Sequence, residues 1–340
     1  MKRLFALVLA LLLLTGCAVP AAKTETTQQY TATFLTLFDT VTTIIGRAEN
    51  EEAFKTVSQT IHDDLLFYHQ LFDIYNDYDG VNNLKTINDN AGVAPVKVDK
   101  AIIDLLLDCK DFYELTVGRV NVAMGSVLQL WHESRNDGIN DPANAKLPAM
   151  EDLQEAAKHT SFDAICIDEA ASTVYITDPN ARVDVGAVAK GWATQRAAEN
   201  APDGMLISVG GNVCATGPKN GDSPWVVGIQ NPDGGDYLHT VYVETGCVVT
   251  SGDYQRTFPV DGKFYHHIID PDTLYPSEYF RSVTVVCADS GLADALSTAL
   301  FGLPLEEGMA LAKQCGVEAM WMHTDGKLSY TPGFADIIRK

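Results

Sequence analysis

The chain has 340 residues, and its 45 acidic side chains outnumber its 24 lysines and arginines, so the formal net charge is −21. This charge excludes a protein that binds nucleic acid or an anionic membrane surface through clustered Lys and Arg. Hydrophobic residues make up 46% of the chain, a share that is typical of globular proteins and excludes general disorder. An anionic ligand must therefore be held locally, by a helix N-terminus, a few placed cations or a metal.

The first residues have the pattern of an export signal. The basic start Met1–Arg3 precedes the apolar run Leu4–Leu14, which is too short to span a bilayer but suits a signal peptide. The run ends in LTGC, which resembles the lipobox of bacterial lipoproteins. We expect a signal peptide over 1–16, a lipidated Cys17 with a polar tether over 17–32, and an extracytoplasmic protein anchored by lipid to the bacterial cell membrane. The alternative is an ordinary signal peptide before a coincidental cysteine.

The remaining chain, 33–340, is expected to be one compact α+β unit. Apolar residues at helical spacing predict helices at 50–75, 99–115, 150–158, 186–200, 292–301 and 305–315. Short β-branched runs bounded by Gly, Pro, Asn and Asp predict strands at 164–167, 173–176, 205–209, 225–230, 240–243, 264–269 and 283–287. Helices first and strands later favour N-terminal helices packed on a mostly antiparallel meander. No linker divides this unit.

Six cysteines follow Cys17, and none lies in a C-x-x-C pair or near a histidine at zinc-ligand spacing. Several lie in apolar runs such as AICID and VVCAD, so we expect buried free thiols without a role in the chemistry. An even number outside the cytoplasm also permits disulfides, which the sequence alone does not pair.

The segment VDVGAVAKGWA at 183–193 predicts a site for an anion. A strand ending in Asp184 leads to Gly186 and then to Lys190, which opens a helix. Glycine lets the backbone approach a ligand, a helix start offers free N–H groups, and the lysine adds a positive charge. The segment is not a Walker A loop. The alternative is a plain strand, turn and helix with a solvated lysine.

Two further segments carry candidate chemistry. His266 and His267 are adjacent, so on a strand they face opposite sides and one can enter a site, although either alone is commonly structural. Asp294 and Thr298 are four residues apart on a predicted helix, which puts their oxygens on one face. A carboxylate and a hydroxyl suit Mg²⁺, which takes its other ligands from phosphates and water. The alternative is a local Asp–Thr hydrogen bond.

Seven segments in this order resemble the FAD:protein FMN transferase (ApbE) family, whose fold is related to the T-fold. They are LFDTVTT, FDIYNDYDGVNNLKTIN, GRVNVAMGSVLQLWHE, VDVGAVAKGWA, ISVGGNVCATG, TSGDYQRTF with DGKFYHHIIDP, and ADALSTALFGL. The resemblance implies Mg²⁺-dependent transfer of FMN from FAD to a Thr or Ser hydroxyl of a partner flavoprotein, forming a phosphodiester and releasing AMP. The acceptors implied are flavoproteins of extracytoplasmic redox systems.

The same resemblance implies roles for individual residues. Mg²⁺ would take the Ala187 carbonyl with the Asp294 and Thr298 side chains. Phe38 stands where the family commonly has Met, and Asn121 where it has Asp. The residues implied to contact FAD are Phe38, Tyr75, Arg119, Val120, Asn121, Asp184, Lys190, His267, Ile268 and Ser297.

His267 is the first candidate for the general base that takes the proton of the acceptor hydroxyl. Asp253 and Asp270 are alternatives, Asp270 also as a group that orients the imidazole or closes the turn before Pro271. Other functions stay open: a Mg²⁺-dependent FAD pyrophosphatase, with water as the acceptor, and a lipoprotein that binds FAD without turnover.

Overall fold

The structure is a computed structural model that describes residues 27–340. The expected signal peptide, Cys17 and most of the tether lie outside these residues. No helix in the described part of the chain is long and apolar enough to cross a membrane.

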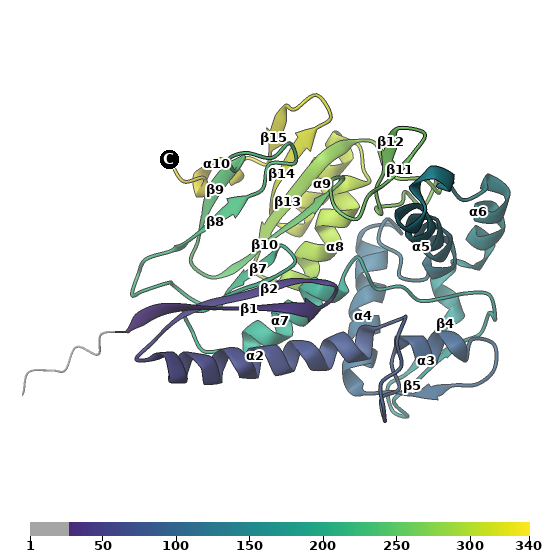
Figure 1. The fold of residues 1–340 in the computed structure, drawn as a ribbon, viewed down its shortest axis with the longest axis horizontal. Coiled ribbons are helices and arrows are strands. Elements are labelled where there is room, and N and C mark those ends of the chain that lie inside the picture. The colour runs from purple at the N-terminus through teal and green to yellow at the C-terminus, as the bar shows by residue number, and fades with distance from the viewer. Residues whose placement is uncertain (1–26) are drawn as a thin grey trace, which may run out of the picture.

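A large antiparallel sheet forms the centre of the molecule (Figure 1). Its eight strands lie in the order β1-β2-β6-β7-β10-β13-β14-β15. The strands are β1 (Gln28–Leu37), β2 (Thr40–Ala48), β6 (Leu206–Val209), β7 (Asn212–Ala215), β10 (Gly246–Gly252), β13 (Phe280–Cys287), β14 (Glu318–His323) and β15 (Leu328–Tyr330).

Helices cover this sheet. The helices α7 (Ala189–Asn200) and α8 (Ser290–Phe301) pack against each other; α8 also packs on β10 and β13, and α7 on β6 and β7. The long helix α2 (Glu51–Phe72) contacts α7 and β1, and α9 (Leu305–Cys315) contacts α8 and β14. The cavity described below lies where α7 and α8 meet the ends of the strands.

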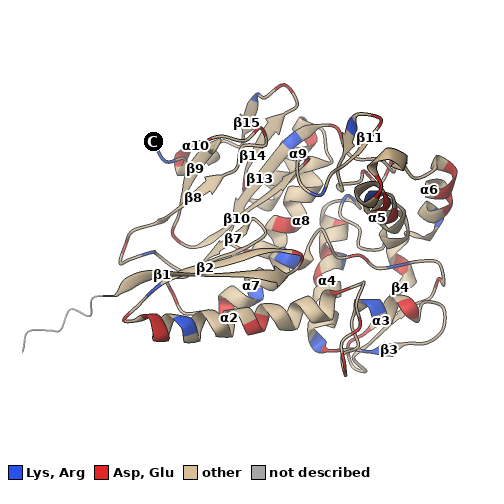
Figure 2. Ribbon diagram, viewed as in Figure 1, with Lys and Arg blue, Asp and Glu red and all other residues tan. Residues whose placement is uncertain are grey.

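A smaller helical part adjoins the sheet at the right of Figure 1. It contains α3 (Leu84–Asp89), α4 (Lys100–Leu115), α5 (Gly125–Asn140), α6 (Met150–Ala156), and a sheet in the order β3 (Val96–Lys97), β5 (Thr173–Ile176), β4 (Ile165–Asp168). Acidic side chains are spread over exposed helices such as α2 and α6 rather than gathered in one patch (Figure 2).

Two hairpins lie outside these sheets. β8 (Trp225–Ile229) and β9 (His239–Val243) are inserted between β7 and β10. They pack with Met320 of β14 and with Phe334 of the short helix α10 (Phe334–Ile337). β11 (Phe258–Val260) and β12 (Lys263–Tyr265) pack against α5.

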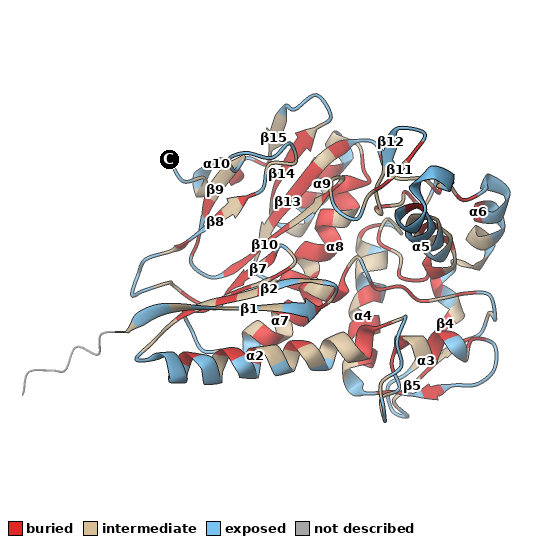
Figure 3. Ribbon diagram, viewed as in Figure 1, coloured by how far each residue is buried: buried red, intermediate tan, exposed pale blue. Residues whose placement is uncertain are grey.

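Burial is deepest at α8, between the sheet and the other helices (Figure 3). Every residue of α8 except Leu292 and Thr298 is buried, because its Ala, Gly and Ser side chains let neighbouring backbones approach closely. Asp289 starts the helix by accepting the Leu292 N–H at 2.7 Å. The polar oxygens of α8 are therefore held in a rigid frame.

The predicted α+β class and the single domain are confirmed. Each predicted helix is present, the one at 305–315 with the predicted ends and the others with ends shifted by a few residues. Three predictions are corrected. Residues 28–32 belong to β1 and not to a tether, since Tyr30 stacks on Phe54 of α2. The strand expected at 264–269 stops at Tyr265. The segment before Asp184 forms no strand and makes only an isolated bridge from Arg182 to Met124.

Candidate functional site

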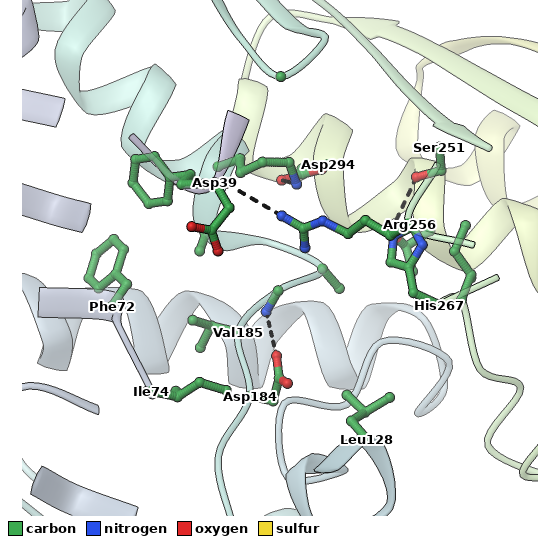
Figure 4. A pocket seen from close by; sticks show the side chains of 18 of the residues that line it. Asp39, Phe72, Ile74, Leu128, Asp184, Val185, Ser251, Arg256, His267 and Asp294 are labelled. Atoms are coloured by element: carbon green, nitrogen blue, oxygen red, sulfur yellow. Dashed lines mark hydrogen bonds and ion pairs between the residues drawn. The ribbon is translucent and has the colours of Figure 1, made fainter. Parts of the chain in front are cut away.

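One open cavity of about 220 Å³ gathers most of the residues singled out in the sequence (Figure 4). It lies between the β1–β2 hairpin tip, the start of α7, the end of β10 and the segment after β12. The predicted residues that line it are Phe38, Tyr75, Arg119, Val120, Asn121, Asp184, Ala187, Lys190, His267, Ile268, Asp294 and Thr298. Ser297, Asp253 and Asp270 are not among the lining residues.

The turn before α7 is held by Asp184. Its Oδ1 accepts the Gly186 N–H at 2.8 Å, and its own N–H donates to the Val122 carbonyl at 2.8 Å. The preceding residue is fixed by the buried Asn88 side chain, which accepts the Val183 N–H at 2.7 Å and donates to the Val183 carbonyl at 2.9 Å. These bonds replace the strand pairing that the sequence led us to expect.

The start of α7 is joined to α8 by a short contact. The Gly191 N–H donates to Asp294 Oδ2 at 2.8 Å, and Lys190 Nζ lies 3.6 Å from the same oxygen. A Cβ at position 191 would lie 2.2 Å from the Ser290 carbonyl oxygen, so only glycine fits. Asp294 therefore bonds across to α7, and the local Asp–Thr hydrogen bond considered above is not formed.

The three residues expected to hold Mg²⁺, Asp294, Thr298 and Ala187, all line the cavity. The ligands expected from them are one carboxylate, one hydroxyl and one backbone carbonyl. The described residues contain no group of three or more His, Cys, Asp or Glu arranged for a metal. Mg²⁺ needs only one or two protein carboxylates when phosphates and water complete its shell, so this donor set fits Mg²⁺.

Ser297 lies behind the wall of the cavity. Its hydroxyl donates to the Asp294 carbonyl at 3.0 Å and lies 2.8 Å from Ser251 Oγ. Ser251 lines the cavity and lies 3.4 Å from Thr298 Oγ1. The structure thus places Ser251, and not Ser297, at the surface that a ligand would meet, because position 297 is on the sheet side of α8.

The two histidines have different surroundings. His266 is structural: its Nε2 lies 2.9 Å from the Ser277 carbonyl oxygen and its Nδ1 accepts the Ile268 N–H at 3.2 Å. His267 faces the cavity, and its buried Nδ1 has no hydrogen-bond partner among the described residues. Desolvation, with the positive charges of Arg256 and Lys190, lowers the pKa of His267 to about 3. Its imidazole is therefore neutral at physiological pH and able to accept a proton.

The two aspartates weighed as alternative bases are engaged elsewhere. Asp253 Oδ2 accepts from Arg281 Nε at 2.7 Å. Asp270 Oδ1 accepts the N–H groups of Asp272 and Thr273 at 2.8 and 3.1 Å, which closes the turn. Its Oδ2 lies 3.6 Å from Arg119, so Asp270 holds a cavity arginine in place.

Comparison with known proteins agrees with this geometry. The profile of the ApbE family matches residues 38–321. The chain belongs to the ApbE family. It is 34% identical over 277 residues to an FAD:protein FMN transferase of Treponema pallidum, which covers 75% of each chain. It is 31% identical over 256 residues to the one of Klebsiella pneumoniae, with 72% of this chain and 77% of the other covered.

The crystal structure of the ApbE protein of Thermotoga maritima superposes with a TM-score of 0.82 and 31% identity, covering 92% of this chain and 100% of the other. The predicted family and its fold are thereby confirmed.

Sequence reasoning missed two arginines of this ApbE cavity. Arg135 and Arg256 line it, and neither makes an ion pair with any described residue. Desolvation, and then the nearby Arg256, lower the pKa of Arg135. Two unpaired guanidinium groups in an acidic protein indicate an anionic ligand. The signal was present, since Arg256 lies within the segment TSGDYQRTF and Arg135 directly follows WHES.

His132 was also missed. Its Nδ1 lies 2.7 Å from the Tyr75 hydroxyl, and its Nε2 lies 3.9 Å from Asp184 Oδ2. Burial lowers the pKa of His132, and Asp184 opposes that shift. Through these contacts His132 of α5 connects Tyr75 with Asp184, at the turn that precedes α7.

The β1–β2 hairpin brings a strained tip to the cavity. Phe38 and Asp39 have φ values of 52° and 53°, the left-handed region that hairpin turns usually fill with Asn-Gly. The Phe38 N–H donates to His69 Nδ1 at 3.2 Å, and its carbonyl accepts from Arg256 Nη2 at 3.4 Å. Non-glycine residues in this conformation cost of order 1–3 kcal/mol each, so the surrounding bonds must hold the tip.

Proposed function

We propose that this chain is an FAD:protein FMN transferase that moves FMN from FAD to a Thr or Ser hydroxyl of a partner flavoprotein and releases AMP. The observation that carries the proposal is the junction of α7 and α8, where Lys190, the helix start and the oxygens of Asp294 and Thr298 line one cavity. Support also comes from the relatives of Treponema pallidum and Klebsiella pneumoniae, which are named FAD:protein FMN transferases.

The pyrophosphate of FAD is the anion that this cavity would bind. The positive end of the α7 dipole and the ammonium of Lys190 offer positive potential at one side, while the Gly191 N–H is engaged by Asp294. At the other side, Arg256 and Arg135 offer guanidinium groups that form no ion pair with residues 27–340. These groups create a local positive potential that attracts an anion, whereas the net charge of −21 repels it over the rest of the surface.

Magnesium is part of the proposal. Ala187, Asp294 and Thr298 would hold the ion with their oxygens, and bound Mg²⁺ would neutralise charge on the pyrophosphate as the bond to AMP breaks. Removing it with EDTA should weaken FAD binding at least tenfold, measured by flavin fluorescence. Unchanged affinity in EDTA would contradict the magnesium site.

His267 is proposed as the general base. Its neutral imidazole would accept the proton of the attacking hydroxyl, and a negatively charged substrate opposite Arg256 and Lys190 would raise its pKa toward neutrality. A positioned base contributes about 10²–10⁴-fold to the rate. His267→Ala should lower transfer by that factor while FAD still binds, whereas Asp253→Asn should leave the chemical step nearly unchanged.

The hydrolase and the passive FAD binder use the same residues, so the products decide between them. The protein is incubated with FAD, Mg²⁺ and a candidate acceptor, and the acceptor mass and the released nucleotides are measured. Covalent FMN on the acceptor with free AMP supports transfer. Free FMN with AMP and no adduct supports a pyrophosphatase, and intact FAD supports a binder.

We also propose export and lipid anchoring at Cys17, with the acceptor in an extracytoplasmic redox system. The support is the LTGC sequence after the apolar run Leu4–Leu14. Cys17→Ser should move the protein from the membrane fraction to the soluble one and abolish incorporation of labelled fatty acid. Retention of label in the variant would refute the anchor.

A further inference from the structure

Three cysteines lie side by side across three neighbouring strands of the large sheet. Cys247 of β10 is directly opposite Cys214 of β7, and on its other side it is directly opposite Cys287 of β13. Residues opposite each other in an antiparallel pair project to the same face, with Cβ atoms about 4.5–5.5 Å apart. A disulfide joins Cβ atoms at about 3.5–4.5 Å, so a small movement of either neighbour would suffice.

The surroundings of the thiols favour one of the two pairs. Cys214 and Cys247 are 4% and 0% exposed, and both thiols are free. The Cys287 thiol donates to the Asp289 carbonyl at 3.1 Å, which turns it toward the start of α8. Cys247 has only long contacts outside the row, 3.8 Å to Gln195 Oε1 and 3.9 Å to the Ala288 carbonyl. Within the described part of the chain, Cys214 is therefore the partner without a competing hydrogen bond.

We infer that Cys214 and Cys247 form a disulfide that closes the base of the β8–β9 hairpin. The chain between these cysteines leaves the large sheet, forms β8 and β9, and returns to the sheet at β10. A cross-link from β7 to β10 would fix the two points at which this insertion begins and ends. The inference does not depend on the proposed transferase activity.

The bond would form by exchange with an external disulfide, such as oxidised glutathione or a thiol oxidoreductase. One protein thiolate attacks the external disulfide, forms a mixed disulfide and releases one external thiol. The second protein thiolate then attacks the protein sulfur of the mixed disulfide and releases the other external thiol. One protein S–S bond forms, one external S–S bond is reduced, and the two protons of the cysteine thiols pass to the two external thiols. Contact with Cys214 and burial raise the pKa of Cys247, so the folded sheet holds little thiolate. The exchange therefore belongs to folding, before the strands close.

The cross-link would also bear on the cavity. Asn212 lies two residues from Cys214 on β7, and Thr250 and Ser251 lie farther along β10 from Cys247; all three line the cavity. Closing a loop of roughly 30 residues restricts the unfolded chain and stabilises the folded one. We expect a rise of several degrees in the midpoint of thermal unfolding and slower proteolysis within residues 216–245.

The test refolds the protein from denaturant in a glutathione redox buffer, blocks free thiols with N-ethylmaleimide, and maps peptides without reduction. A peptide pair that joins Cys214 to Cys247 supports the inference. Free thiols at both positions, or a bond from Cys247 to Cys287, overturns it. This measurement uses the unaltered sequence, so it does not depend on any variant folding.

Matched variants then test whether the disulfide stabilises the folded protein. Cys214→Ala should abolish the difference in thermal midpoint between oxidised and reduced protein, and Cys287→Ala should preserve it. Cys166→Ser, at an exposed position on β4, should change neither the mapping nor the difference. Equal midpoints for oxidised and reduced protein in the unaltered sequence would overturn the structural role even if the bond forms.

Discussion

Replacing Gly191 by alanine should disturb the junction of α7 and α8 more than any other single methyl group in the site. The new Cβ would lie 2.2 Å from the Ser290 carbonyl oxygen and 2.4 Å from Asp294 Cβ, both parts of α8 that cannot rotate away. Forcing such an overlap costs about 1–3 kcal/mol as the helices separate. The separation also stretches the Gly191 N–H bond to Asp294 Oδ2, and a bond to a charged group contributes about 1.5–3 kcal/mol.

Gly191→Ala should therefore lower the free energy of unfolding by about 3–5 kcal/mol, a large part of the 5–15 kcal/mol typical of a domain. Urea unfolding followed by circular dichroism measures this loss. FAD binding, followed by flavin fluorescence below the unfolding midpoint, should weaken as well, because Lys190 and Asp294 move apart with the helices.

Gly302→Ala is the matched control. Gly302 follows the last residue of α8, and a Cβ there would meet the Ala299 and Thr298 carbonyl oxygens at 3.7 and 3.8 Å, which is ordinary contact. This variant should lose less than about 1 kcal/mol and bind FAD normally. If Gly191→Ala is as stable as Gly302→Ala, the close contact of the two helices is not what positions the site.

Three further outcomes are expected. Because folding lowers the pKa of His267 from 6.5 to about 3, the unfolded chain binds the proton more readily between these values, and stability falls as the pH drops through that window. His267→Gln should flatten that part of the profile of urea midpoint against pH, and an unchanged slope would exclude this histidine as its cause. Asn88→Ala leaves the buried N–H and carbonyl of Val183 unpaired, which should cost about 2–4 kcal/mol in urea unfolding; a loss below 1 kcal/mol would mean that the segment before Asp184 is held by other bonds. Arg256→Ala should raise the Kd for FAD at least tenfold and, through loss of its bond to the Phe38 carbonyl, lower the free energy of unfolding by about 1 kcal/mol. An unchanged Kd in titration calorimetry would remove the guanidinium from the binding site.

The sequence predicted helices well where apolar spacing was regular. The helix predicted at 305–315 has the same ends in the structure, and that at 99–115 differs by one residue. It failed at α5, whose segment Gly125–Asn140 contains two glycines and several Ser, Asn and Asp residues and has no side-chain cap at Met124. Local propensity there opposes the helix, and packing of Val127 and Trp131 into a buried cluster overrides it.

The first two strands were not predicted, for another reason. β1 is an edge strand whose exposed side carries polar residues, so its start is similar in composition to the tether expected there. Leu35 is 72% exposed, which breaks the alternation that marks a half-buried strand. The hairpin itself was hidden by its turn, because Phe-Asp lacks the Asn-Gly pattern of a two-residue loop.

In the site, groups close together along the chain were predictable, and pairings between distant segments were not. Asp184, Ala187 and Lys190 fall in one motif and line the cavity together. The bond from Gly191 to Asp294 joins residues 103 positions apart, so no local pattern indicates it. The contact of Ser297 with Ser251 likewise joins α8 to β10 across 46 positions, so no local pattern indicates which of the two serines lines the cavity.

The distribution of charge connects the acidity of the chain to its cavity. Several lysines form ion pairs with acidic side chains at the surface, such as Lys100 with Asp104 and Lys263 with Glu278. In these pairs the two charges neutralise each other. Arg135 and Arg256 have no such partners among the described residues, so their charge is available to a ligand. An anion approaching from solution first meets the field of the −21 chain and only within about 10 Å meets these guanidinium groups. Added salt must then act in opposite directions, screening the repulsion that slows association and the local attraction that holds the bound anion.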